Sequence, residues 1–147
     1  MEGEARIMDF NGTEVGRTWR VGPIVMDKEK MLAFAREYDP LPLHLDEERA
    51  SRSRHKQRIA PGVMAFMTMW AEFIGQDLWE DNMLGGTSTK IEWLRPVFAG
   101  DTLSGEVVIS AKRRRNPHNG MVEITSRYYN QDDALVMTNV TEMVIAG

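Results

Sequence analysis

Hydrophobic and polar positions along this chain change their period near residue 85, which separates a helical half from a strand half. Before that point, residues 28–38 carry apolar side chains at helical spacing, with Asp27 as the expected N-cap. A first strand is expected at residues 18–26, which are apolar and β-branched, with an edge or a bend at Gly22-Pro23. A short charged helix is expected from Asp46 to about Ser53.

The longest apolar run, residues 59–71, predicts a buried helix from about Gly62 to Gln76. The run is too short to span a bilayer, whose hydrocarbon core needs about 20 apolar residues. We therefore expect a central helix that the rest of the domain covers.

Beyond Gly85-Gly86, apolar and polar residues alternate in four segments, which predicts four strands. Asn116-Pro117-His118-Asn119-Gly120 is a turn signal between the second and third of them. With the first strand, these form a five-stranded antiparallel sheet wrapped around the central helix, an α+β domain covering residues 1–147. Such a sheet leaves two open edges, so a homodimer, or a dimer of dimers, is expected.

Composition narrows the class of protein. A net charge of −4 and a pI near 5.4 disfavour a nucleic-acid partner. The chain has no cysteine, which excludes disulfides, and the N-terminus lacks the apolar segment of a signal peptide, so a cytoplasmic protein is expected. The three histidines are scattered without ligand spacing, so we expect no metal. We expect no other cofactor, and the short apolar run leads us to expect no membrane partner.

Candidate chemistry lies in the segment Tyr38-Asp39-Pro40-Leu41-Pro42-Leu43-His44. It places a carboxylate and an imidazole five positions apart on a loop stiffened by two prolines. Ile59-Ala60-Pro61-Gly62 follows, at the start of the predicted central helix. An acid/base pair next to a helix N-terminus suits proton transfer beside a carbonyl group. Taken singly, the same residues have simpler interpretations: a turn aspartate, a satisfied histidine and a helix-start glycine.

These motifs resemble those of the MaoC-like dehydratases, which include the R-specific enoyl-CoA hydratases. The family's Asp-x-Asn-Pro-x-His motif is matched by Asp39, Pro42 and His44, and its Ile-Ala-His-Gly motif by Ile59-Ala60 and Gly62. Residues 95–103 resemble its Pro-Val-x-x-Gly-Asp-x-Leu segment. The resemblance implies a hotdog fold from about residue 16 to the C-terminus.

The resemblance also implies an acyl-thioester hydratase or dehydratase, acting across the Cα–Cβ bond of an enoyl-CoA-type substrate. Asp39 and His44 would act on the water and the α-proton. Gly62, Pro61 and Leu41 would lie at the thioester oxygen or the acyl group, where the N–H groups of a helix N-terminus meet negative charge. Leu41 replaces the family's usual asparagine and Pro61 its histidine; a drier, more apolar pocket is expected from Leu41.

Two other functions fit the same fold: an acyl-CoA thioesterase, and a non-catalytic binding or dimer-partner subunit. The Asp39/His44 arrangement favours hydration, whereas the substitutions at Leu41 and Pro61 keep the non-catalytic subunit open. The expected partner is an acyl-CoA or acyl-carrier thioester. Basic runs at residues 49–58 and 112–115 can bind its phosphates, although solvated surface is the simpler interpretation. His55 and His118 are expected to be solvated.

Overall fold

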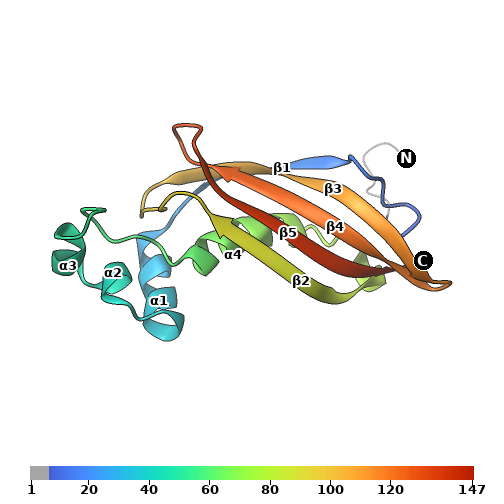
Figure 1. The fold of residues 1–147 in the computed structure, drawn as a ribbon, viewed down its shortest axis with the longest axis horizontal. Helices are drawn as coiled ribbons and strands as arrows, with labels where there is room; N and C mark the ends of the chain where they lie inside the picture. The colour runs from blue at the N-terminus through green and yellow to red at the C-terminus, as the bar shows by residue number, and fades with distance from the viewer. Residues whose placement is uncertain (1–6) are drawn as a thin grey trace.

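The computed structural model describes residues 7–147, which form one antiparallel sheet and four α-helices (Figure 1). The strands are β1 (Thr18–Val25), β2 (Met83–Trp93), β3 (Thr102–Asn116), β4 (Asn119–Tyr129) and β5 (Leu135–Ala146). The helices are α1 (Lys28–Tyr38), α2 (Pro42–Leu45), α3 (Glu47–Ser51) and α4 (Gly62–Ile74), with a 3₁₀ turn, η1, at Glu80–Asn82. The strand order is β1-β3-β4-β5-β2, which confirms the predicted α+β class and five-stranded antiparallel sheet.

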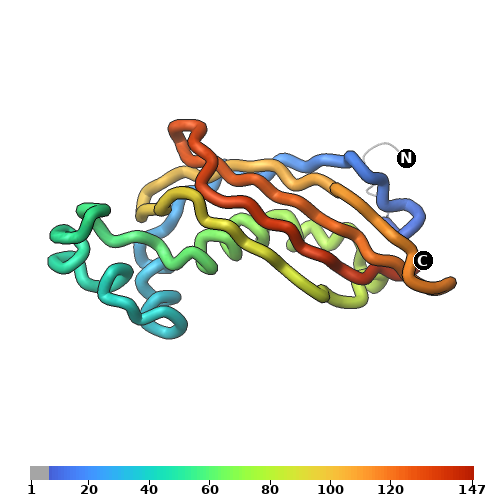
Figure 2. The backbone as a smooth tube through the Cα atoms, in the orientation of Figure 1, coloured from blue at the N-terminus to red at the C-terminus, as the bar shows by residue number. Residues whose placement is uncertain are grey.

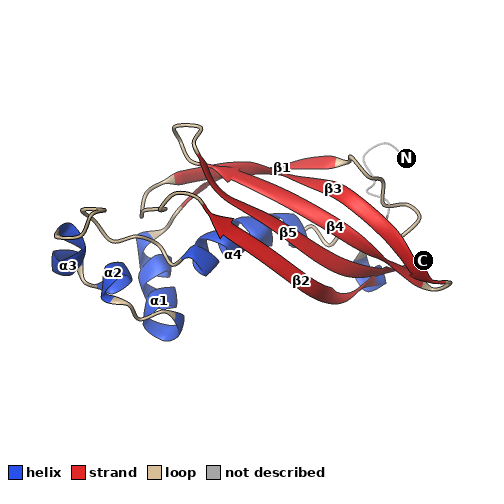
Figure 3. Ribbon diagram, viewed as in Figure 1, coloured by secondary structure: helices blue, strands red, loops and turns tan. Residues whose placement is uncertain are grey.

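Helix α4 runs along one face of the sheet (Figure 3) and supplies much of the core. Its inward side chains are Met64, Ala65, Phe66, Met69, Trp70 and Phe73. Phe73 packs edge-on against Trp19 of β1, with ring centroids 5.2 Å apart. The helix is not covered all round, because Val63 and Met67, four residues apart, are each 48% exposed. One apolar stripe of α4 therefore faces outward.

Helices α1, α2 and α3 lie together beyond one end of the sheet, opposite the C-terminus (Figure 2). The predicted N-caps are both present: the Asp27 carboxylate accepts the N–H of Glu29 at 2.8 Å, and that of Asp46 accepts the N–H of Arg49 at 3.1 Å. The sequence indicated a loop at residues 42–45, but these residues form the short helix α2. Pro42 explains the difference, because its fixed φ suits the first turn of a helix and its missing N–H needs no partner there.

Two hydroxyls are buried on β4 without a hydrogen-bond partner among the described residues, those of Ser126 and Tyr128. Burial raises the pKa of the Tyr128 phenol, and the neighbouring Ser126 hydroxyl offsets only part of that rise.

Over the described part of the chain, none of the helices is long and apolar enough to cross a membrane.

Candidate functional site

Asp39 and His44 are brought together by the tight path of the chain between α1 and α2. Asp39 is the C-cap of α1, and its backbone N–H donates to the Ala35 carbonyl at 3.0 Å. His44 lies in α2, and its Nε2 is 3.1 Å from Oδ2 of Asp39. The imidazole is buried, whereas the Asp39 side chain is 38% exposed. The carboxylate therefore stands between the histidine and solvent.

The backbone of Ile59 fixes the orientation of the imidazole. Nδ1 of His44 lies 2.6 Å from the Ile59 carbonyl oxygen, and the Ile59 N–H donates to the Leu43 carbonyl at 3.3 Å. A carbonyl oxygen can only accept, so Nδ1 carries a proton. In a neutral imidazole Nε2 would then be an acceptor facing an ionised carboxylate. A second proton shared between Nε2 and Oδ2 resolves this conflict, so the geometry suits a pair that holds one exchangeable proton.

Residues 97–101 support the Ile59-Ala60 segment that orients His44. The Ala60 N–H donates to the Val97 carbonyl at 2.7 Å, and Ile59 forms an isolated bridge with Phe98. The Phe98 N–H in turn donates to the Asp101 carboxylate at 2.9 Å. The segment 95–103, singled out in the sequence, thus supports residues 59–60 and, through them, His44.

The Asp39–His44 pair opens onto a pocket of about 460 Å³. Its walls come from three stretches of chain, residues 39–44, 55–65 and 93–97. Gly62, the first residue of α4, is one of them; this helix has no side-chain cap and no acidic residue in its first turn. The first N–H groups of a helix have no partner within it, so they can meet negative charge in the pocket.

The model of the MaoC-like domain family matches residues 10–129, most of the chain. The chain belongs to the MaoC-like domain family. Its fold is the hotdog fold, as the resemblance implied. The (R)-specific enoyl-CoA hydratase of Aeromonas caviae is 29% identical to it over 132 residues, which cover 89% of this chain and 94% of that enzyme. The uncharacterized protein YdeM of Bacillus subtilis is 25% identical over 139 residues, covering 94% of this chain and 99% of that protein.

Solved structures of MaoC-like proteins agree with this fold. A MaoC-like dehydratase from Rhodospirillum rubrum has a TM-score of 0.82 at 25% identity, with 95% of this chain and 97% of that chain covered. The structure of the A. caviae (R)-hydratase has a TM-score of 0.73 at 27% identity, with 88% of this chain and 95% of that chain covered.

Of the other three predicted site residues of this MaoC-like domain, only Gly62 lines the pocket. Pro61 is buried as the N-cap of α4 without lining the pocket. Leu41 is 54% exposed and lies outside the pocket wall; its carbonyl accepts the backbone N–H of His44 at 2.9 Å. Leu41 thus contacts His44 through its backbone.

Among the polar and aromatic residues of the pocket wall, three were not predicted as site residues: His55, Trp93 and Arg95. The prediction of a solvated His55 was wrong, because this residue is half-buried in the wall, whereas His118 is exposed as predicted. No periodicity marks His55, which lies in an irregular stretch. Arg95 begins the segment 95–103 that carries the family resemblance, and Trp93 lies two residues before it; that position was the available signal.

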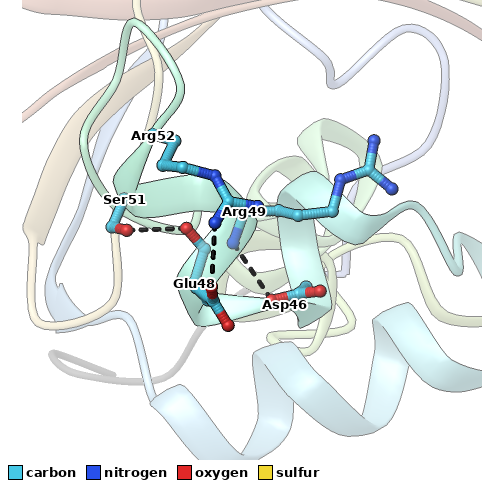
Figure 4. A network of polar contacts seen from close by, with 5 residues as sticks. All are labelled: Asp46, Glu48, Arg49, Ser51 and Arg52. Atoms are coloured by element: carbon cyan, nitrogen blue, oxygen red, sulfur yellow. Dashed lines mark hydrogen bonds and ion pairs between the residues drawn. The ribbon is translucent and has the colours of Figure 1, made fainter.

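The two basic runs differ in their surroundings. Lys112 and Arg114 are used internally: both lie over the Phe10 ring, and Arg114 also donates to the Gly147 carbonyl at 3.0 Å. In the other run, Arg52 pairs with Glu48 at 2.8 Å, while the Arg49 side chain extends away from that pair (Figure 4). Among residues 7–147 there is no cluster of three His, Asp or Glu side chains that could hold a metal ion.

Proposed function

We propose that this protein is a hydratase or dehydratase of acyl thioesters that adds water across, or removes it from, the Cα–Cβ bond of an enoyl-CoA-type substrate. The observation that carries the proposal is the Asp39–His44 pair, 3.1 Å apart, at a pocket that also holds the N-terminus of α4. Membership of the MaoC-like domain family and 29% identity to an (R)-specific enoyl-CoA hydratase support it.

The proton balance of the pair suits hydration. With His44 as imidazolium and Asp39 as carboxylate, the carboxylate takes a proton from water as the water oxygen bonds to Cβ. The imidazolium Nε2–H gives its proton to Cα, which completes the addition. Asp39 is then protonated and His44 neutral, and one proton transfer across the 3.1 Å contact restores the starting state. Dehydration follows the same steps in reverse.

Negative charge that develops on the thioester oxygen needs donors, and α4 supplies them in this proposal. The N–H groups of Gly62 and Val63 lie in the first turn of a helix of 13 residues that has no side-chain cap. Their dipole favours an anion at this end. His55 and Arg95 add cationic or hydrogen-bonding groups to the same wall, which suits the phosphates of a coenzyme A or acyl-carrier thioester.

A homodimer is part of the proposal. The stripe of Val63 and Met67 on α4 is exposed, and β2 is an edge strand that pairs only with β5 within residues 7–147. A second copy can cover both. Light scattering at micromolar concentrations should give at least twice the 16.8 kDa mass of one chain, and a value of one chain throughout would contradict it.

The lack of cysteine suits the cytoplasmic location expected above.

Two assays test the reaction. Purified protein is given crotonyl-CoA, and hydration is followed as loss of the absorbance of the conjugated thioester. Free thiol is measured in parallel with butyryl-CoA, a saturated thioester. Hydration without thiol release supports the proposal. Thiol release alone points to the thioesterase, and neither activity points to a non-catalytic subunit.

A further inference from the structure

Trp93 lies against the first residue of α4. It ends β2, at the edge of the sheet, and its indole packs on Gly62 so closely that a Cβ at position 62 would be 2.5 Å from both Nε1 and Cε2. Any side chain larger than hydrogen at position 62 would push the indole away. Glycine at position 62 therefore leaves the space that the indole occupies.

The surroundings of Trp93 differ from those of the other tryptophans. Trp70 and Trp79 are buried and Trp19 is half-buried, and all three belong to aromatic pairs with Phe73. Trp93 is 48% exposed, and within the described residues it has no aromatic pair and its indole N–H no hydrogen bond. Trp93 is absent from the buried core cluster and from the side chains packed against that cluster, so moving its ring disturbs little of the core.

The indole and the proposed substrate compete for one space. Trp93, Gly62 and Val63 line the same pocket, and a thioester oxygen that reaches the N–H groups of α4 must pass beside Gly62. Resting on the proposed function, we propose that Trp93 is the specificity-determining residue of this site. An acyl thioester displaces the indole from Gly62, and the space left beside the displaced ring limits the size of the acyl group that binds.

Ligand binding tests the displacement without relying on turnover. Butyryl-CoA is titrated into the protein by calorimetry, and tryptophan emission and acrylamide quenching are recorded at the same concentrations. The wild type should bind and change its emission and quenching. Trp93→Phe should bind by calorimetry but lose the emission change, while the control Trp19→Phe should keep it. Absence of binding to the wild type, or the same emission change in wild type and Trp93→Phe, would overturn the proposal.

Acyl selectivity is the second measurement. For Trp93→Ala, the ratio of kcat/KM for oct-2-enoyl-CoA to that for crotonyl-CoA should rise about tenfold or more, the scale of pocket-size discrimination, and mainly through KM. An unchanged ratio would refute the specificity role. Circular dichroism should show that Trp93→Ala is folded. Trp93→Phe, which keeps an aromatic ring, is the conservative control for a folding defect. If the wild type binds butyryl-CoA with the expected emission change but hydrates neither substrate, the proposed function fails while the displacement of Trp93 stands.

Discussion

Asp39→Asn removes the exchangeable proton of the Asp39–His44 pair but keeps the hydrogen bond between the two side chains. Nδ1 of His44 donates to the Ile59 carbonyl at 2.6 Å, so a neutral imidazole presents Nε2 as an acceptor. The side-chain amide that this substitution introduces can donate an N–H to that nitrogen across the same 3.1 Å contact. The variant pair is therefore satisfied with His44 neutral, and it holds no proton to exchange.

The expected effects on stability and on activity are consequently very different. No buried polar atom loses its partner, so the free energy of unfolding should change by no more than about 0.5 kcal/mol. Turnover should fall by about 10²–10⁴-fold, the usual effect of removing a positioned acid or base. That loss corresponds to about 2.7–5.4 kcal/mol of transition-state stabilisation.

Crotonyl-CoA hydration and urea unfolding measure the two effects on the same preparations. Asp46→Asn is the matched control, since Asp46 caps α3 in the neighbouring segment and asparagine caps a helix about as well as aspartate. This control should keep both activity and stability. Hydration by Asp39→Asn within a few-fold of the wild type, or an equal loss in Asp46→Asn, would refute the proposed proton-holding role.

Three further outcomes are expected. His44→Ala should lower turnover by about 10²–10⁴-fold. In urea unfolding, its free energy of unfolding should also be lower by about 1–3 kcal/mol, because the Ile59 carbonyl loses its donor. An unchanged free energy of unfolding would show that this contact is unimportant for stability. Leu41→Asn should leave crotonyl-CoA turnover unchanged, because the side chain lies outside the pocket, and a clear gain would show that the family's asparagine matters. Tyr128→Phe should be neutral or stabilising at pH 7, since the hydroxyl has no hydrogen-bond partner among residues 7–147. Burial raises the pKa of Tyr128 above 10.0, so at high pH the unfolded chain binds fewer protons at this residue than the folded chain does. The free energy of unfolding of the wild type should therefore fall as pH rises from 10.0 through the folded-state pKa. Tyr128→Phe should lack that part of the fall, which urea unfolding at several pH values can check.

Local patterns in the sequence were sufficient for most of the fold. The alternation after Gly85-Gly86 and the apolar run of α4 predicted the sheet and its central helix, because side chains point to one face with a period of two in strands and near 3.6 in helices. Asp27 and Asp46 were identified as caps from their position alone. The pairing of Asp39 with His44 was also predictable, because both lie in one short segment that turns between two helices.

The sequence was less informative about how much of α4 is covered and about residues 42–45. Val63 and Met67 stay exposed because the single sheet packs on one side of the helix. The α2 helix depends on Pro42 at its first position, and proline in a Pro-x-Pro segment is equally typical of a loop.

The remaining residues of the pocket wall were decided by tertiary structure. His55, Trp93 and Arg95 reach the wall from segments far from Asp39 in the chain, because the end of β2 arrives beside the N-terminus of α4 only when the sheet has formed. The proton on Nδ1 of His44 is likewise set by a carbonyl 15 residues away. Local spacing determines which residues share a helix or strand face; which faces meet depends on the packing of the whole domain, and here that packing places Trp93 on Gly62.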